Sequence, residues 1–115
     1  MFRAAIITAS DKGAKGQRED VSGSVIREIL EQNGYEVVYQ INLPDERQLL
    51  AAEMERICVQ QQADLILTTG GTGFSPRDWT PEATLDVIER QVPGIPEAMR
   101  LNSLQITKRA MLSRA

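Results

Sequence analysis

A glycine-rich segment in the second half of the chain is the sharpest candidate for chemistry. It reads Thr68-Thr69-Gly70-Gly71-Thr72-Gly73 and follows Leu-Ile-Leu at positions 65–67. Glycines let a backbone approach a ligand closely and point its N–H groups at an anion, while threonines add hydroxyl donors. The segment is neither a Walker A loop nor a G-x-G-x-x-G dinucleotide pattern. A plain tight turn is the alternative, but the glycines exceed what a turn needs, so the segment predicts an anion-binding cradle.

Two aspartates are candidate functional residues beside that cradle. Asp45 follows a predicted strand, and Asp78 lies in the loop before Thr80. Two carboxylates that converge on one cleft would make a Mg²⁺ site. The spacing of Asp45 and Gln48 by itself favours a helix-capping box, and Asp78 could be a solvated loop acid. The side chains that could balance phosphate charge are Lys12, Lys15, Arg18 and Arg77.

Composition excludes several classes of site. The chain has 115 residues, 42% of them hydrophobic, no histidine, one cysteine and a net charge of −3. Without histidine, Ser-His-Asp and Cys-His nucleophiles and histidine-based metal sites are excluded, and a carboxylate site suits Mg²⁺ better than Zn²⁺. The acidic balance argues against general nucleic-acid binding. A lone cysteine and the absence of any apolar run near the roughly 20 residues that span a bilayer predict a cytoplasmic protein with no membrane contact.

The elements that must position these residues alternate between strands and helices. Apolar and β-branched runs predict strands at 3–9, 35–43 and 64–69. Helical periodicity and start signals predict helices at 21–33 and 46–62, from Thr80, and from Pro96 to about residue 105. Residues 106–114 could begin another strand, and Cys58 is expected in the core. This order predicts one α/β domain over residues 1–115, with a mostly parallel sheet covered on both faces.

Parallel sheets bind ligands outside the carboxyl ends of their strands. Three polar or flexible segments are predicted at that edge, at residues 10–20, 44–45 and 70–80. They can therefore line one crevice. Three strands make a thin sheet for this architecture, so we expect the domain to be incomplete at its C-terminus.

The combination of these motifs resembles the molybdenum-cofactor biosynthesis proteins of the MogA/MoaB type, the molybdopterin adenylyltransferases. The resemblance covers essentially the whole chain. It rests on the segments Ser10-Asp11, Asp20–Gly23, Leu43–Asp45, Thr69–Gly73, Arg77-Asp78, Thr80–Ala83, Gly94–Met99 and Ala110–Arg114.

The resemblance implies a three-layer α/β/α domain that assembles as a homotrimer or hexamer. It implies Mg²⁺-dependent transfer of AMP from ATP to the terminal phosphate of molybdopterin, with release of pyrophosphate. A partner protein would then insert molybdate. The family continues beyond the length of this chain, which again suggests a C-terminally truncated domain.

The family's site residues carry over by motif. Asp45 and Asp78 match the catalytic acids and are the candidate Mg²⁺ ligands. The candidate substrate-binding residues are Ser10, Asp11, Thr69, Gly70, Gly71, Thr72, Gly73 and Ser75. The alternatives are a non-catalytic protein that binds molybdopterin or another phosphate, and an assembly module. The presence of both aspartates favours the enzyme, because pure binding needs the glycine segment but not both acids.

Overall fold

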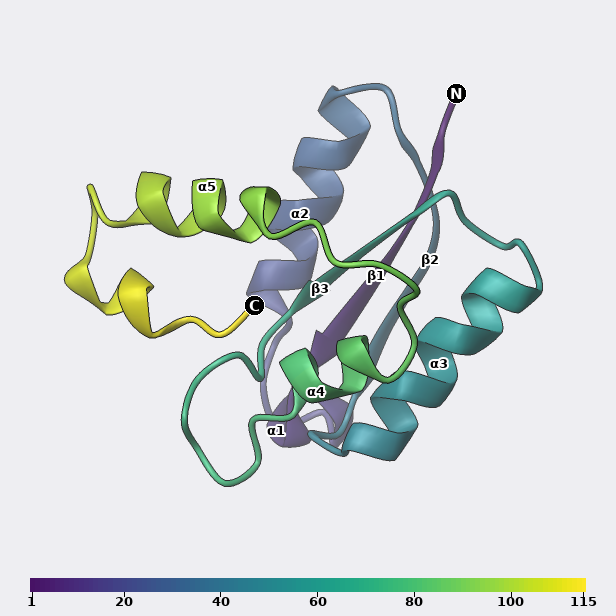
Figure 1. Cartoon of the computed structure of the whole chain (residues 1–115). Coiled ribbons are helices and arrows are strands. Elements are labelled where there is room, and N and C mark those ends of the chain that lie inside the picture. The colour runs from purple at the N-terminus through teal and green to yellow at the C-terminus, as the bar shows by residue number, and fades with distance from the viewer.

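A three-stranded parallel sheet forms the centre of the computed structural model, which describes residues 1–115 (Figure 1). The strands are β1 (Arg3–Ala9), β2 (Glu36–Leu43) and β3 (Leu65–Thr69), in the order β2-β1-β3. Strand β1 is central, and its residues from Ala4 to Ala9 are all buried. A continuous apolar run suits this position because a central parallel strand is covered on both faces.

Helices cover both faces of the sheet and make three layers. One face of β1, through Ala5 and Ile7, packs against α3 (Arg47–Val59) and α4 (Thr80–Leu85). The other face, through Ala4 and Ile6, packs against α2 (Val21–Gln32). In α3 the buried residues recur at helical spacing, at Leu50, Met54 and Ile57. The predicted α/β/α architecture with a parallel sheet is confirmed.

Three local predictions are wrong. The loop predicted for residues 10–20 contains a short helix, α1 (Asp11–Ala14), because the Ser10 hydroxyl accepts a hydrogen bond from Gly13 N at 3.0 Å and caps it. Residues 106–114 form no strand. They contain a 3₁₀ helix, η1 (Lys108–Leu112), where the Thr107 hydroxyl accepts from Arg109 N at 3.3 Å. Cys58 is exposed, because it lies about 100° around α3 from the buried Ile57.

Asp45 does not cap α3, contrary to the capping-box interpretation. Glu46 stands at the cap position, and no side chain hydrogen-bonds the first turn. The Asp45 carboxylate instead accepts from the backbone N–H of Asp11, at the end of the neighbouring strand. The Asp45 carboxylate therefore makes a contact between two loops instead of capping its own helix.

The last helical segment lies apart from the sheet and returns to the glycine-rich loop. Helix α5 (Gly94–Ser103) extends away from the sheet and lies beside η1 (Figure 1). After η1 the backbone N–H of Arg114 donates to the carbonyl of Thr72 at 2.9 Å. None of the helices is both long and apolar enough to span a membrane.

Candidate active site

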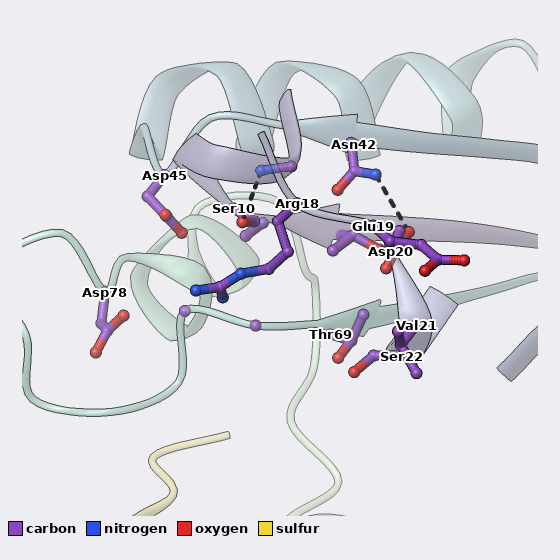
Figure 2. A pocket seen from close by; sticks show the side chains of 15 residues that line it. Ser10, Arg18, Glu19, Asp20, Val21, Ser22, Asn42, Asp45, Thr69 and Asp78 are labelled. Carbon is purple, nitrogen blue, oxygen red and sulfur yellow. Dashed lines mark hydrogen bonds between the residues drawn. The ribbon is translucent and has the colours of Figure 1, made fainter. Parts of the chain in front are cut away.

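A cavity of about 440 Å³ lies at the carboxyl ends of the strands (Figure 2). Its wall includes Thr8 at the end of β1, Asn42 at the end of β2 and Thr69 at the end of β3. Strand β1 lies between the other two strands, with β2 on one side and β3 on the other. Such a switch in strand order opens a crevice between the outgoing loops, where α/β sheets bind ligands.

The glycine turn after β3 forms one wall of this cavity. Gly70 and Gly71 have positive φ angles of 86° and 68°. A Cβ on Gly70 would overlap the carbonyl oxygen of Ala9, so the turn lies directly on the end of β1. The buried Thr80 holds the turn from the other side, because its hydroxyl donates to Gly70 O at 2.7 Å and its N–H donates to Gly71 O at 3.1 Å.

Four consecutive backbone N–H groups, those of residues 70–73, donate no hydrogen bond within the chain. Unpaired amides in a turn with left-handed residues form a concave set of donors that suits an anion. A Cβ on Gly71 would lie 2.5 Å from Thr80 Oγ1, so a substitution there disturbs the turn before any ligand is involved.

Asp11 joins the three loops at this edge of the sheet. Its N–H donates to Asp45 Oδ2 at 3.0 Å, and its own Oδ1 accepts from Asp45 N at 2.9 Å. Arg77 donates to both Asp11 oxygens, at 2.9 and 3.1 Å. These hydrogen bonds with Arg77, and the one from Asp45 N, lower the pKa of Asp11. The Arg77 guanidinium therefore already pairs with a carboxylate of the protein.

Asp45 and Asp78 both line the cavity (Figure 2), and a backbone N–H orients each of them. Asp45 Oδ2 accepts from Asp11 N, and Asp78 Oδ2 accepts from Ser75 N at 2.9 Å. The second oxygen of each carboxylate accepts no hydrogen bond within the chain. Burial raises the pKa of Asp45, and the negative charges of Asp11 and Asp78 raise it further. The pair therefore offers two free oxygens in a site that would gain from a cation.

A third acid, Asp20, links three segments in the opposite wall of the cavity. Its Oδ2 accepts from Thr8 Oγ1 at 2.9 Å and from Asn42 Nδ2 at 3.3 Å, and its Oδ1 accepts from Gly23 N at 2.9 Å (Figure 2). One carboxylate thus caps α2 and joins the ends of β1 and β2. Asp20 is therefore the residue that begins the helix predicted for residues 21–33.

Asp20→Ala is expected to lower the free energy of unfolding by about 2–4 kcal/mol, since it removes a helix cap and leaves the buried Thr8 hydroxyl unpaired. Asp20→Asn keeps an oxygen for Gly23 N and is the matched control, with a smaller loss. Urea unfolding measures both. Equal losses in the two variants would contradict the capping contribution.

Residues 5–115 match the family model described as a probable molybdopterin binding domain. The chain belongs to this molybdopterin-binding family. It is 44% identical over 112 residues to the molybdopterin adenylyltransferase of Helicobacter pylori, covering 95% of this chain and 63% of the relative. It is 34% identical over 116 residues to that of Escherichia coli, covering 98% and 59%. The chain thus spans less than two thirds of the length of these relatives.

Solved structures agree with the family assignment. The molybdopterin biosynthesis enzyme MoaB of Thermus thermophilus superposes with a TM-score of 0.91 at 46% identity, covering 99% of this chain and 72% of that one. A MogA structure superposes with a TM-score of 0.90 at 34% identity, covering 97% and 73%. The resemblance to MogA and MoaB in the sequence motifs is confirmed.

The site residues predicted for the family fall into two groups. Those that line the cavity are Ser10, Asp45, Thr69, Gly70, Gly71 and Asp78. Those outside its wall are Asp11, Thr72, Gly73 and Ser75. Asp11 and Ser75 contact the two aspartates through hydrogen bonds, and the carbonyls of Thr72 and Gly73 accept hydrogen bonds from Arg114. These four residues support the wall in this structure.

Sequence reasoning missed part of the wall. Thr8, Asn42 and Glu19 line the cavity but carried no signal beyond their places at strand ends or before a helix. Arg18 is one of four cations that the sequence offers to balance phosphate charge. It is the single Lys or Arg on the wall, it forms no ion pair or hydrogen bond, and its guanidinium extends toward the side holding Asp45 and Asp78 (Figure 2).

The residues present fit the Mg²⁺ implied by the family if the ion is bound jointly by the protein and by substrate phosphates. The structure contains no group of three or more His, Cys, Asp or Glu side chains that could hold a metal. Mg²⁺ is commonly bound by one or two carboxylates together with substrate phosphates and water. Asp45 and Asp78, each with one free oxygen, match that donor set.

Proposed function

We propose that this domain catalyses the transfer of AMP from ATP to the terminal phosphate of molybdopterin. The observation that carries the proposal is one cavity whose wall combines the glycine turn, with the unpaired backbone N–H groups of Gly70 and Gly71, and two oriented aspartates. Relatives that are named molybdopterin adenylyltransferases support the choice of substrates. Molybdenum cofactor biosynthesis is the process to which these relatives belong.

The reaction needs no general base from the protein. An oxygen of the terminal phosphate of molybdopterin is already ionised at neutral pH, and it attacks the α-phosphorus of ATP. The bond from that phosphorus to the bridging oxygen breaks, and the electron pair leaves with pyrophosphate. The absence of histidine is compatible with this chemistry.

The residues of the site would bring two polyanions together. The amides of residues 70–73 would hold phosphate oxygens, and Arg18 would add the one free positive charge of the wall. Asp45 and Asp78 would hold Mg²⁺, which supplies charge neutralisation on the leaving pyrophosphate. Alignment of two bound reactants can contribute about 7–11 kcal/mol to lowering the barrier.

Pyrophosphate release from ATP, Mg²⁺ and molybdopterin tests this function. We expect release from this chain that depends on molybdopterin and stops when EDTA removes Mg²⁺. The Helicobacter pylori relative serves as the positive control. Molybdopterin binding without release would favour the binding-protein alternative. If the chain bound neither ATP nor molybdopterin, the assembly-module alternative would replace the proposal.

The proposed setting is a cytoplasmic homotrimer or hexamer that passes its product to a molybdate-insertion protein. Exposed apolar side chains on and beside α5 support self-association. They include Ile95, Met99, Leu101 and Met111.

A further inference from the structure

Arg114 donates three hydrogen bonds to carbonyls of the segment from Thr72 to Asp78, which lies far before it in the chain. Its backbone N–H donates to Thr72 O at 2.9 Å. Its guanidinium donates to Gly73 O through Nε at 2.7 Å and to Asp78 O through Nη2 at 2.8 Å. The remaining nitrogen, Nη1, pairs with Glu82 Oε2 at 2.5 Å. One side chain therefore spans both ends of the segment from Gly73 to Asp78.

The loop has two separate anchors. Thr80 holds its first part, through the carbonyls of Gly70 and Gly71. Arg114 holds the second part, which carries Asp78. Within that part the hydrogen bonds between Ser75 and Asp78 are internal, and Arg77, directly before Asp78, donates to Asp11. Arg114 is the side chain that holds the Asp78 carbonyl itself, between the Arg77 contact and the buried Thr80.

We propose that Arg114 is a positioning residue that sets the place of Asp78 and of the amides at residues 72 and 73. The catalytic part of this statement rests on the proposed function. Arg114 does not line the cavity, so its effect reaches the site through the carbonyls of Gly73 and Asp78. A planar guanidinium can hold these two carbonyls and Glu82 at the same time, because it presents several donors in a fixed fork.

A simpler role would be an ion pair with Glu82 that only stabilises the fold. The two roles predict different outcomes when lysine replaces Arg114. Lysine keeps a positive charge near Glu82, but a single ammonium cannot span the carbonyls of Gly73 and Asp78 in the same geometry. Arg114→Lys should therefore behave like Arg114→Gln if Arg114 positions the loop. It should behave like the unmodified chain if charge alone is required.

Trp79 provides a readout that is independent of activity. It is the only tryptophan, it follows Asp78 directly, and it is 37% exposed, so it can become more accessible. Acrylamide quenching of its fluorescence under native conditions is expected to rise roughly twofold in Arg114→Lys and Arg114→Gln, because the loop opens more often. Arg109→Gln removes the same charge from η1 without a side-chain contact and should leave quenching unchanged. Urea curves verify that each variant is folded.

Kinetics of pyrophosphate release supply the second readout. We expect both Arg114 variants to lose about 100-fold in kcat with a KM for ATP within about threefold, because Asp78 is displaced while Gly70 and Gly71 stay anchored. Normal kcat in Arg114→Lys, or unchanged Trp79 quenching in both variants, would overturn the positioning role. If the unmodified chain releases no pyrophosphate, the proposed function fails. Trp79 quenching then still decides whether Arg114 holds the loop.

Discussion

Asp45→Asn is expected to lower pyrophosphate release by about a thousandfold and at the same time to raise the free energy of unfolding at neutral pH. Activity falls because the variant loses a charged oxygen at the metal and phosphate site. Stability rises because asparagine removes a partly buried negative charge that lies near Asp11 and Asp78. The amide oxygen of asparagine can still accept from Asp11 N. Asp78→Asn should lose activity to a similar extent.

The direction of the stability change follows from the raised pKa of Asp45. Burial raises this pKa above the ordinary value of 3.8. A group whose pKa is higher in the folded state stabilises the fold most below the unfolded pKa, and this contribution is lost as pH rises through the folded pKa. The advantage of Asp45→Asn over the unmodified chain should therefore be present at neutral pH and vanish at about pH 3, below the ordinary pKa of 3.8. Urea unfolding at the two pH values measures it.

Two variants serve as controls for Asp45→Asn. Asp45→Ala removes the acceptor for Asp11 N and should be less stable than the asparagine variant by about 1–2 kcal/mol. Asp64→Asn changes an acid at the opposite end of the sheet, where hydrogen bonds from Arg3 lower the pKa of Asp64. It should lose stability at neutral pH and keep its activity. Full activity in Asp45→Asn would remove Asp45 from the mechanism.

Gly70→Ala is expected to lower the free energy of unfolding by about 4 kcal/mol and to abolish ATP binding. An added methyl group meets the Ala9 carbonyl, and the residue must also hold a φ of 86°. Either the turn moves away from β1 or the strand end is distorted, and both responses destroy the wall of the cavity. Urea unfolding and equilibrium binding of ATP measure the two effects.

Gly16→Ala separates steric overlap from backbone strain. Gly16 has a similar φ of 71°, but a Cβ there would have no atom within 4 Å. Its loss should be about 1–2 kcal/mol, which is the cost of a left-handed residue with a side chain. If Gly70→Ala cost no more than Gly16→Ala, the close contact between the turn and β1 would not matter energetically.

The sequence by itself determined the architecture and the location of the site. Apolar runs at 3–9, 35–43 and 64–69 correspond to β1, β2 and β3, because side-chain type and periodicity are local properties that decide between strand and helix. The order of elements then implied a parallel sheet, and a parallel sheet implied a crevice at the carboxyl ends. The glycine segment and both aspartates were expected at this edge, and the structure brings them to one cavity.

Only the tertiary structure decided which partners these side chains take. Capping-box spacing indicated a local role for Asp45, but the pairing of Ala9 with Leu43 in the parallel sheet places Asp11 and Asp45 side by side. The roles of Asp20 and Arg114 arise in the same way, from contacts between segments far apart in the chain. Residue spacing describes neighbours within a helix or strand. Strand register and loop return decide the rest, because they bring distant donors and acceptors within hydrogen-bonding distance.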